Sequence, residues 1–165
     1  MYTAAVITVS DRASRGEYED VTGQVLVQML KDAGYDVVET SLVPDERDQI
    51  EAELIRLSDQ NIALILTTGG TGFAPRDVTP EATLTVIDRA APGIAEAIRA
   101  RSLAITPRAM LSRAVSGLRG KTLIINLPGS PKAVRESLEV VLPVLPHAVE
   151  TLSGNTQNCG GNYGK

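Results

Sequence analysis

The residues best suited to chemistry lie between Thr67 and Glu81, in the sequence TTGGTGFAPRDVTPE. An apolar run at 64–66 passes directly into glycines and threonines. A strand that ends in glycines commonly brings backbone N–H groups against an anion. Asp77 follows shortly after, and carboxylates beside bound phosphates are common Mg²⁺ ligands. This stretch predicts a site for a phosphorylated ligand with a divalent metal beside it.

The glycine run matches neither of the common phosphate-binding fingerprints. No Lys-Ser/Thr pair follows the glycines, so it is not a Walker A loop, and the spacing G-x-G-x-x-G is absent. The alternative is a tight surface turn that needs glycine for positive φ. The run of glycine and threonine favours an anion or nucleotide site, with these candidate residues: Thr68, Gly69, Gly70, Thr71 and Gly72.

A second candidate anion site is the sequence PGSPK, from Pro128 to Lys132. Ser130 is placed to cap a helix that has Pro131 at its first position. Backbone N–H groups at that helix start, together with Lys132 one turn in, would suit a phosphate. An ordinary, well-capped turn from strand to helix fits the motif equally well, and the sequence alone leaves both interpretations open.

Two aspartates have competing interpretations. Asp77 is either a Mg²⁺ ligand or orienting carboxylate, or a residue that caps loop amides or pairs with Arg76. Asp45 precedes a predicted helix, and its local sequence slightly favours a helix N-cap over a metal ligand. A structural and a metal-binding role are compatible only if different carboxylate oxygens serve each.

An alternation of strands and helices must position these residues. Apolar, β-branched runs predict four strands, at 3–9, 35–43, 61–67 and 121–127. Helices are expected between and after them, including one at 21–33, one capped by Thr79 and one that begins at Pro131. The fold class is therefore α/β, with three layers and a mainly parallel sheet covered by helices on both faces. Ligands of such sheets bind beyond the carboxyl ends of the strands, so the candidate residues should converge there.

The chain is expected to form a single domain over residues 1–152. From Ser153 to Lys165 the sequence is polar and rich in glycine, and it predicts a flexible C-terminal tail. The polar stretch from Ala13 to Asp20 is a loop longer than a plain connection requires, which is typical of a functional loop. The pattern between Ser102 and Gly120 is weak and predicts only loops or short helices.

Composition excludes several classes of function. The net charge is −4 and aromatic residues make up 3% of the chain, which disfavours binding to nucleic acid or to an anionic membrane. The single cysteine, Cys159, cannot form an internal disulfide, and no signal peptide is visible, so a cytoplasmic location is expected. His147 is interpreted as a packed or surface residue. No CxxC, HxxxH or GxSxG pattern is present to support a zinc hydrolase or an α/β-hydrolase.

These motifs, taken together and in order, resemble the Mog-type molybdenum cofactor biosynthesis proteins. The resemblance rests on TTGGTGFAPRDVTPEAT at 67–83 and LIINLPGSPK at 123–132. It extends to SDRAS at 10–14, VPDE at 43–46 and MLSR at 110–113, and covers about residues 3–152. This family includes bacterial molybdopterin adenylyltransferases and the G domain of gephyrin.

The resemblance implies a homotrimer that uses ATP and Mg²⁺ to adenylylate molybdopterin and releases pyrophosphate. A molybdate-inserting enzyme would be a transient partner. Asp45 and Asp77 match the family's catalytic, metal-binding aspartates, which favours the metal role for both. The glycine run would hold the nucleotide, and the remaining matched positions would bind nucleotide or pterin: Ser10, Asp11, Arg12, Ser112, Arg113, Asn126, Pro128, Gly129, Ser130 and Lys132.

A second interpretation comes from a close subgroup, the B-type proteins, which share the fold and much of the glycine motif. On that interpretation the chain is a non-catalytic molybdopterin-binding or carrier protein. The SDRAS and VPDE segments favour the Mog type. An oligomeric scaffold, a role that animal relatives also serve, is less favoured because no additional interaction domain is present in the sequence.

Overall fold

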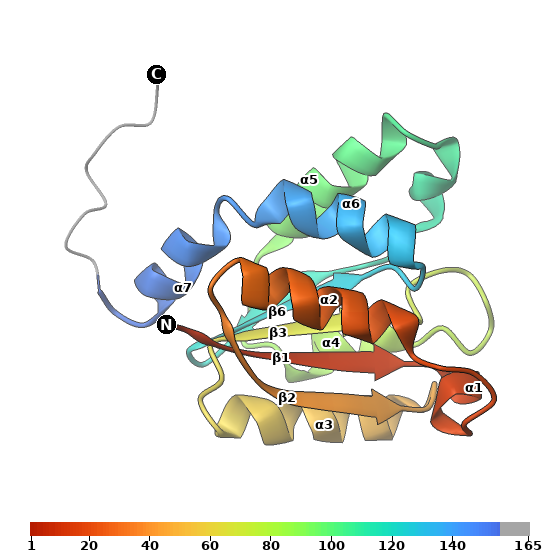
Figure 1. The fold of residues 1–165 in the computed structure, drawn as a ribbon, viewed down its shortest axis with the longest axis horizontal. Helices are drawn as coiled ribbons and strands as arrows, with labels where there is room; N and C mark the ends of the chain where they lie inside the picture. Colours follow the sequence, from red (N-terminus) through yellow and green to blue (C-terminus); the bar gives the residue numbers. More distant parts are fainter. Residues whose placement is uncertain (156–165) are drawn as a thin grey trace.

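A single sheet forms the centre of the molecule (Figure 1). The structure is a computed structural model and describes residues 1–155. Its six strands run in the order β2-β1-β3-β6-β5-β4. The first four in that order are mutually parallel, and β5 and β4 are antiparallel additions. The strands are β1 (Thr3–Val9), β2 (Asp36–Val43), β3 (Leu64–Thr68), β4 (Arg89–Ala90), β5 (Ser116–Arg119) and β6 (Thr122–Leu127).

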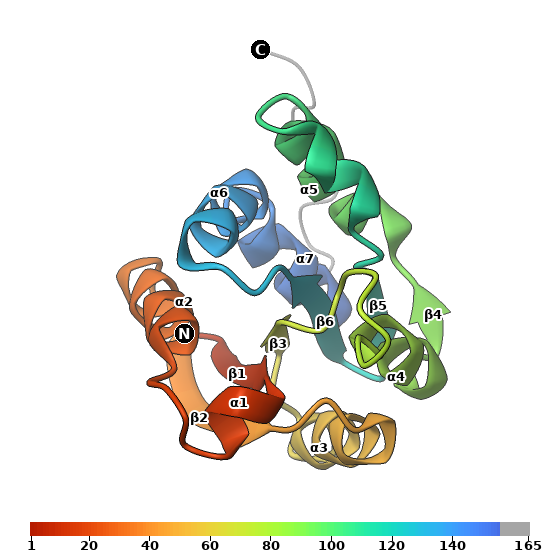
Figure 2. The ribbon, with the colours of Figure 1, turned by 90° about the vertical axis from the view of Figure 1, so that its right-hand side faces the viewer.

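Helices cover both faces of this sheet. On one face lie α2, α5, α6 and α7, and on the other lie α3 and α4 (Figures 1 and 2). The predicted three-layer α/β fold with a mainly parallel sheet is thus confirmed. The helices are α1 (Asp11–Ser14), α2 (Val21–Asp32), α3 (Arg47–Asp59), α4 (Thr79–Val86), α5 (Pro92–Leu103), the 3₁₀ helix η1 (Pro107–Leu111), α6 (Pro131–Val141) and α7 (Leu145–Leu152).

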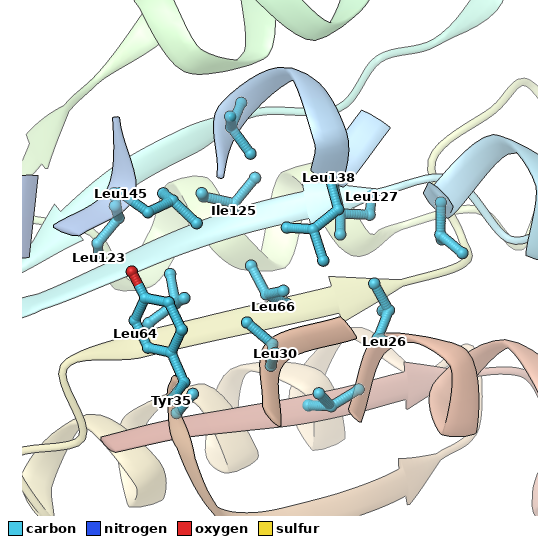
Figure 3. Close-up of a cluster of buried hydrophobic side chains, with 14 of the residues drawn as sticks. Leu26, Leu30, Tyr35, Leu64, Leu66, Leu123, Ile125, Leu127, Leu138 and Leu145 are labelled. Carbon is cyan, nitrogen blue, oxygen red and sulfur yellow. The ribbon is translucent and has the colours of Figure 1, made fainter. Parts of the chain in front are cut away.

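Alternate residues of the central strands build a separate core on each face. Toward α2 and α6, the side chains of Leu64, Leu66 and Ile125 pack against Leu30 and Leu138, all fully buried (Figure 3). The neighbouring strand residues point the other way and pack against α3 and α4: Ala5, Ile7, Ile65 and Ile124. Burial on both faces explains why these strands are continuous apolar runs rather than alternating ones.

The carboxyl ends of the parallel strands meet at one edge. The arrowheads of β1 and β2 point to the side where α1 lies (Figure 1). The segments that follow β1, β2, β3 and β6 at this edge begin with SDR, PDE, GGTG and PGS respectively, and the first of them opens α1. The convergence predicted for the glycine run, the turn at Pro128 and Asp45 beyond the carboxyl ends of the strands is therefore confirmed.

Several local predictions were wrong. Segment 116–119, expected as loop or short helix, is strand β5, and residues 11–14 form a helical turn at the start of an expected loop. Thr79 is the first helical residue of α4 rather than its N-cap, which is Val78. Pro146 lies in the first turn of α7, so it starts a helix instead of ending one.

Residues 156–165, including Cys159, are outside the described residues, so the predicted flexibility of segment 153–165 stays a prediction. Residues Ser153 to Asn155 follow the end of α7. Over residues 1–155, no helix has both the length and the apolar character needed to cross a membrane.

Candidate functional site

A cavity of about 490 Å³ lies at the carboxyl edge of the sheet. Its walls come from the ends of β1, β2, β3 and β6 and from the segment at 18–22, which precedes and opens α2. The predicted residues Ser10, Asp45, Asp77 and Ser130 all line it, as do Thr68, Gly69, Gly70 and Gly129. The structure therefore brings both glycine-containing turns and both aspartates to one cavity.

The glycine turn after β3 has a shape that other residues cannot adopt without strain. Gly69 has φ +99° and Gly70 has φ +66°. A Cβ atom on Gly69 would overlap the carbonyl oxygen of Val9, and one on Gly70 would overlap the hydroxyl of Thr79 and lie 3.1 Å from Oδ1 of Asp45. Glycine is required here because the turn passes directly against β1 and α4.

The glycine turn is joined to the turn at Pro128. The hydroxyl of Thr68 donates to the carbonyl of Pro128 at 2.6 Å, and the amide of Gly69 donates to that of Leu127 at 3.2 Å. Thr22, at the start of α2, donates to the carbonyl of Gly129 at 3.0 Å. The two candidate anion sites therefore form one continuous wall, which suits two phosphate groups brought close together.

The helix start beside this wall is as predicted, but its lysine does not reach the cavity. Ser130 accepts a hydrogen bond from the amide of Ala133 at 3.2 Å and so caps α6. Lys132 is exposed, and its Nζ lies 3.8 Å from Glu136. It is not among the residues that line the cavity.

Asp77 serves the loop with one oxygen and leaves the other unused. Its Oδ2 accepts hydrogen bonds from the amides of Gly72 and Ala74, both at 3.1 Å. Within residues 1–155, its Oδ1 makes no hydrogen bond. The interpretation of Asp77 as a cap of loop amides is confirmed, and its pairing with Arg76 is wrong, because Arg76 binds Asp11 and Glu46 instead.

The N-cap interpretation of Asp45 was wrong. Glu46 occupies the N-cap position of α3, without a side-chain hydrogen bond. Asp45 instead pairs with Asp11: its Oδ2 accepts from the Asp11 amide at 2.9 Å, and its own amide donates to Oδ1 of Asp11 at 3.0 Å. Long-range pairing of this kind cannot be inferred from the residues flanking a helix start.

Burial gives Asp45 an unusual electrostatic environment. The pKa of its carboxyl is raised, chiefly because burial disfavours the charged form, and the nearby carboxylates of Asp11 and Asp77 act in the same direction. The pKa of Asp11 is lowered, mainly by its hydrogen bond from Arg76. A cation between Asp45 and Asp77 would remove the penalty at Asp45.

The lining of the cavity is acidic. It includes Glu19, Asp20, Asp45 and Asp77, whereas no lysine or arginine lines it among the residues that the structure describes. No group of three or more metal-ligating side chains is present in the described part of the chain. Two convergent carboxylates fit Mg²⁺, which is typically bound by one or two carboxylates together with substrate phosphates and water.

Arg113, another predicted residue, holds the loop after β3 in place. Its guanidinium donates to the carbonyls of Gly72, at 2.8 Å, and Asp77, at 2.7 Å, and pairs with Glu81. The amide of Arg113 donates to the carbonyl of Thr71, which is buried. Arg113 therefore stabilises the backbone of the loop that carries Asp77.

Asn126 and Ser112 lie away from this cavity. Asn126 is fully buried, donates to Thr67 and Thr83, and accepts from the amide of Val115, so its polar atoms are used inside the protein. It borders the smaller cavity described next, and its contact with substrate stays a prediction. Ser112 lines a second, more apolar cavity of about 200 Å³ between α5, η1 and α6, on the other side of Pro128.

The sequence marked the loop at 13–20 as functional, but none of residues 18–20 was named as a site residue. Tyr18, Glu19 and Asp20 line the cavity. Asp20 caps α2 through the amide of Gly23 and accepts from the hydroxyl of Thr8, while the hydroxyls of Tyr18 and Ser10 lie 2.8 Å apart. Arg12 stacks over the ring of Tyr18, 5.3 Å from its centroid, and does not line the cavity. The unusual length of this loop was the available signal.

The chain is similar to known proteins over most of its length. Residues 5–147 match the family described as "Probable molybdopterin binding domain". The molybdopterin adenylyltransferase of Helicobacter pylori (strain J99 / ATCC 700824) is 47% identical over 153 residues, which are 91% of this chain and 87% of that protein. The molybdopterin adenylyltransferase of Escherichia coli (strain K12) is 48% identical over 139 residues, covering 82% of this chain and 71% of that protein.

A solved structure shows the same fold. The molybdopterin biosynthesis enzyme MoaB from Thermus thermophilus superposes with a TM-score of 0.89 at 51% identity. The alignment covers 93% of this chain and 98% of that one. The similarity therefore extends over nearly the whole length of both chains.

Proposed function

This chain belongs to the molybdopterin-binding family, and from that premise we propose that it is a molybdopterin adenylyltransferase using ATP and Mg²⁺. The observation that carries the proposal is the pair of aspartates at the cavity. Asp45 and Asp77 line one cavity beside two joined glycine turns. Within the described chain, only one carboxylate oxygen of each accepts hydrogen bonds. The relatives named as adenylyltransferases support the same reaction.

The proposed reaction needs positioning more than acid–base chemistry. A terminal phosphate oxygen of molybdopterin attacks the α-phosphorus of ATP. A new P–O bond forms, the bond from the α-phosphorus to the bridging oxygen breaks, and pyrophosphate leaves with that electron pair. The attacking phosphate is already ionised near neutral pH, so no protein base is required. This fits a cavity without histidine or cysteine among its described lining residues.

The chain's own residues would hold two anions against each other. The glycine turn, with Thr68 and Gly70, would hold the phosphates of ATP through backbone N–H groups. The turn from Pro128 to Ser130 would hold the junction between nucleotide and pterin. Asp45 and Asp77 would hold Mg²⁺, which when bound neutralises charge on the phosphate oxygens.

A test of this proposal is direct transfer. The protein is mixed with molybdopterin, ATP and Mg²⁺, and adenylylated molybdopterin is sought by mass spectrometry. We expect product with the wild-type protein, and at least about a 100-fold lower rate with Asp45→Asn or Asp77→Asn, since each removes a ligand of the catalytic cation. Molybdopterin binding should survive in both variants. Full activity in both would contradict the metal assignment.

One observation favours a second candidate, a molybdopterin-binding protein of the B type that does not transfer AMP. The similar Thermus thermophilus structure carries the name MoaB. This candidate predicts tight molybdopterin binding without ATP turnover. A folded wild-type protein that yields no adenylylated pterin would favour it over the transferase.

The proposal also covers the location, the oligomeric state and the partner of the protein. We place the protein in the cytoplasm as a homotrimer that passes its product to a molybdate-inserting enzyme. Light scattering of the purified protein tests the trimer. A mass of one chain, about 17.5 kDa, would contradict it.

A further inference from the structure

Arg76 connects the two loops that carry the aspartates of the cavity. It lies in the loop between β3 and α4, next to Asp77 in the chain. Its guanidinium binds Asp11 with two hydrogen bonds, of 2.6 and 3.1 Å, and Glu46 with one of 2.8 Å. Arginine is suited to this role because its planar fork matches a carboxylate in a fixed orientation.

Asp11 extends the connection to Asp45. The backbone amide of each of these residues donates to the carboxylate of the other, at 2.9 and 3.0 Å. Oδ1 of Asp11 accepts hydrogen bonds from both Arg76 and the Asp45 amide, and its Oδ2 accepts a second one from Arg76. Arg76, Asp11 and Asp45 form a continuous chain of hydrogen bonds, from the loop that carries Asp77 to the end of β2.

Arg76 does not itself line the cavity. Arginines near a phosphate site commonly bind the phosphate, yet the charged partners of Arg76 are carboxylates outside the cavity. Its side chain is 55% exposed, so its pairing contributes little to overall stability. Neither phosphate binding nor stability therefore explains why Arg76 lies among the carboxylates of Asp11 and Glu46 beside Asp45.

We infer that Arg76 is a positioning residue that fixes Asp45 relative to Asp77, so that both can hold one divalent cation. This inference rests on the proposed function for the metal-binding role of the two aspartates, but not for the transfer reaction. Each aspartate lies on a separate loop, and metal affinity depends on the distance between ligands being set before the metal arrives. Arg76 connects those two loops twice, through Asp11 to the backbone of Asp45 and by its ion pair with Glu46, the residue after Asp45.

A metal-binding measurement tests the inference separately from catalysis. Mn²⁺ binding is followed by the loss of the free-ion signal in electron paramagnetic resonance, with a non-hydrolysable ATP analogue present. We expect Arg76→Gln to weaken Mn²⁺ binding about 10-fold, as outer-shell substitutions commonly do. Arg76→Lys should lie between Gln and wild type, because lysine restores the charge but not the fork.

A matched control separates positioning from loss of a surface ion pair. Arg56 also connects two elements, through Glu39 at 2.8 Å and Glu53 at 2.7 Å, but lies outside the cavity. Arg56→Gln should leave Mn²⁺ binding unchanged, and the two Arg-to-Gln variants should have similar melting temperatures. If Arg76→Gln bound Mn²⁺ as wild type does, or lost binding only in proportion to unfolding, the inference would be overturned.

A double-mutant cycle tests the route through Asp11. If Arg76 acts through Asp11, then Arg76→Gln should weaken Mn²⁺ binding much less in an Asp11→Asn background than in wild type. Additive effects would contradict the route. In the transfer assay, Arg76→Gln should lower kcat and raise the Mg²⁺ requirement, with little change in KM for molybdopterin.

Mn²⁺ binding and adenylyl transfer by the wild-type protein test the inference about Arg76 and the proposed function separately. Wild-type protein that binds Mn²⁺ with the analogue but forms no adenylylated pterin would refute the proposed function alone. Wild-type protein that binds no Mn²⁺ under these conditions would refute the inference about Arg76.

Discussion

At this site the two oxygens of one carboxylate differ in their contacts. Asp77 uses Oδ2 to hold two loop amides, and Asp45 uses Oδ2 to hold the amide of Asp11. The second oxygen of each makes no hydrogen bond within residues 1–155, which suits the proposed metal role. A residue can therefore serve both fold and function, but the division depends on long-range contacts that its sequence neighbours do not reveal.

The raised pKa of Asp45 predicts a conflict between stability and activity. The ionised form of Asp45 is disfavoured in the folded state. The contribution of Asp45 to the free energy of unfolding is therefore fully present below its ordinary pKa of 3.8, and it is lost as the pH rises through the raised pKa of the folded protein. Asp45→Asn removes the charge but can still accept the Asp11 amide. We expect this inactive variant to melt above wild type at pH 7.

Scanning calorimetry at decreasing pH checks this prediction. The difference in melting temperature between Asp45→Asn and wild type should shrink as the pH falls through the raised pKa of Asp45, because its carboxyl in the folded protein is then neutral. Asp36→Asn, at an exposed position, is the control and should show no comparable gain. A lower melting temperature for Asp45→Asn at pH 7 would show that burial does not govern this residue.

The glycine turn allows a paired comparison of two substitutions. Gly70→Ala combines positive φ with overlap against Thr79 and close approach to Asp45, whereas Gly16 has φ +73° with open space around it. We expect Gly70→Ala to destabilise by about 2–4 kcal/mol and to lose adenylyl transfer, and Gly16→Ala to cost only about 1 kcal/mol and stay active. Urea denaturation and the transfer assay measure both, and equal effects would show that strain alone matters.

At the scale of elements, Asn126 joins three of them. From β6 its amide donates to Thr67 of β3 and Thr83 of α4, and its oxygen accepts from the amide before β5. Removing a buried group of this kind leaves partners without hydrogen bonds, which costs more than the bonds themselves contribute. Its role is to hold β5 and α4 in place against the parallel part of the sheet.

Asn126→Ala should therefore destabilise the protein by about 2–4 kcal/mol. The control is Gln28→Ala on the exposed side of α2, which should change stability by less than about 0.5 kcal/mol. Urea unfolding followed by circular dichroism gives both values. A loss for Asn126→Ala as small as that of the control would mean that water replaces its hydrogen bonds.

The elements that sequence predicts well are those whose pattern is local. The four parallel strands and the capped helix at Ser130 follow from apolar runs and cap residues. Strand β5, SGLR, has no such pattern because pairing with β6 specifies it, and β4 has only two residues, Arg89 and Ala90. Residues 18–20 of the predicted functional loop were not singled out for the same reason, because contacts with β1 and α2 place them.

At the scale of the whole molecule, the arrangement of charge limits what can bind. The net charge is −4, and the arginines around the site are occupied elsewhere: Arg76 on Asp11, Arg113 on Glu81 and Arg99 on the carbonyls of Ser112 and Ala114. Four acidic residues line the cavity, and no basic residue of the described chain joins them. A polyphosphate that enters without a counterion would meet repulsion from the cavity walls.

This arrangement predicts that ATP binds as its metal complex. By calorimetry, the affinity for ATP should fall at least about 10-fold when EDTA replaces Mg²⁺, because the cavity supplies carboxylates but no cation to the phosphates. Adenosine, which carries no phosphate, is the control ligand, and its affinity should not depend on Mg²⁺. In a protein with both Asp45→Asn and Asp77→Asn, ATP should bind with little dependence on the metal, since the repulsion and the ligands are removed together. Equal ATP affinity of the wild-type protein with and without Mg²⁺ would contradict this prediction. It would mean that cations outside the described lining neutralise the phosphates, and that the two aspartates stabilise the loops rather than bind a metal.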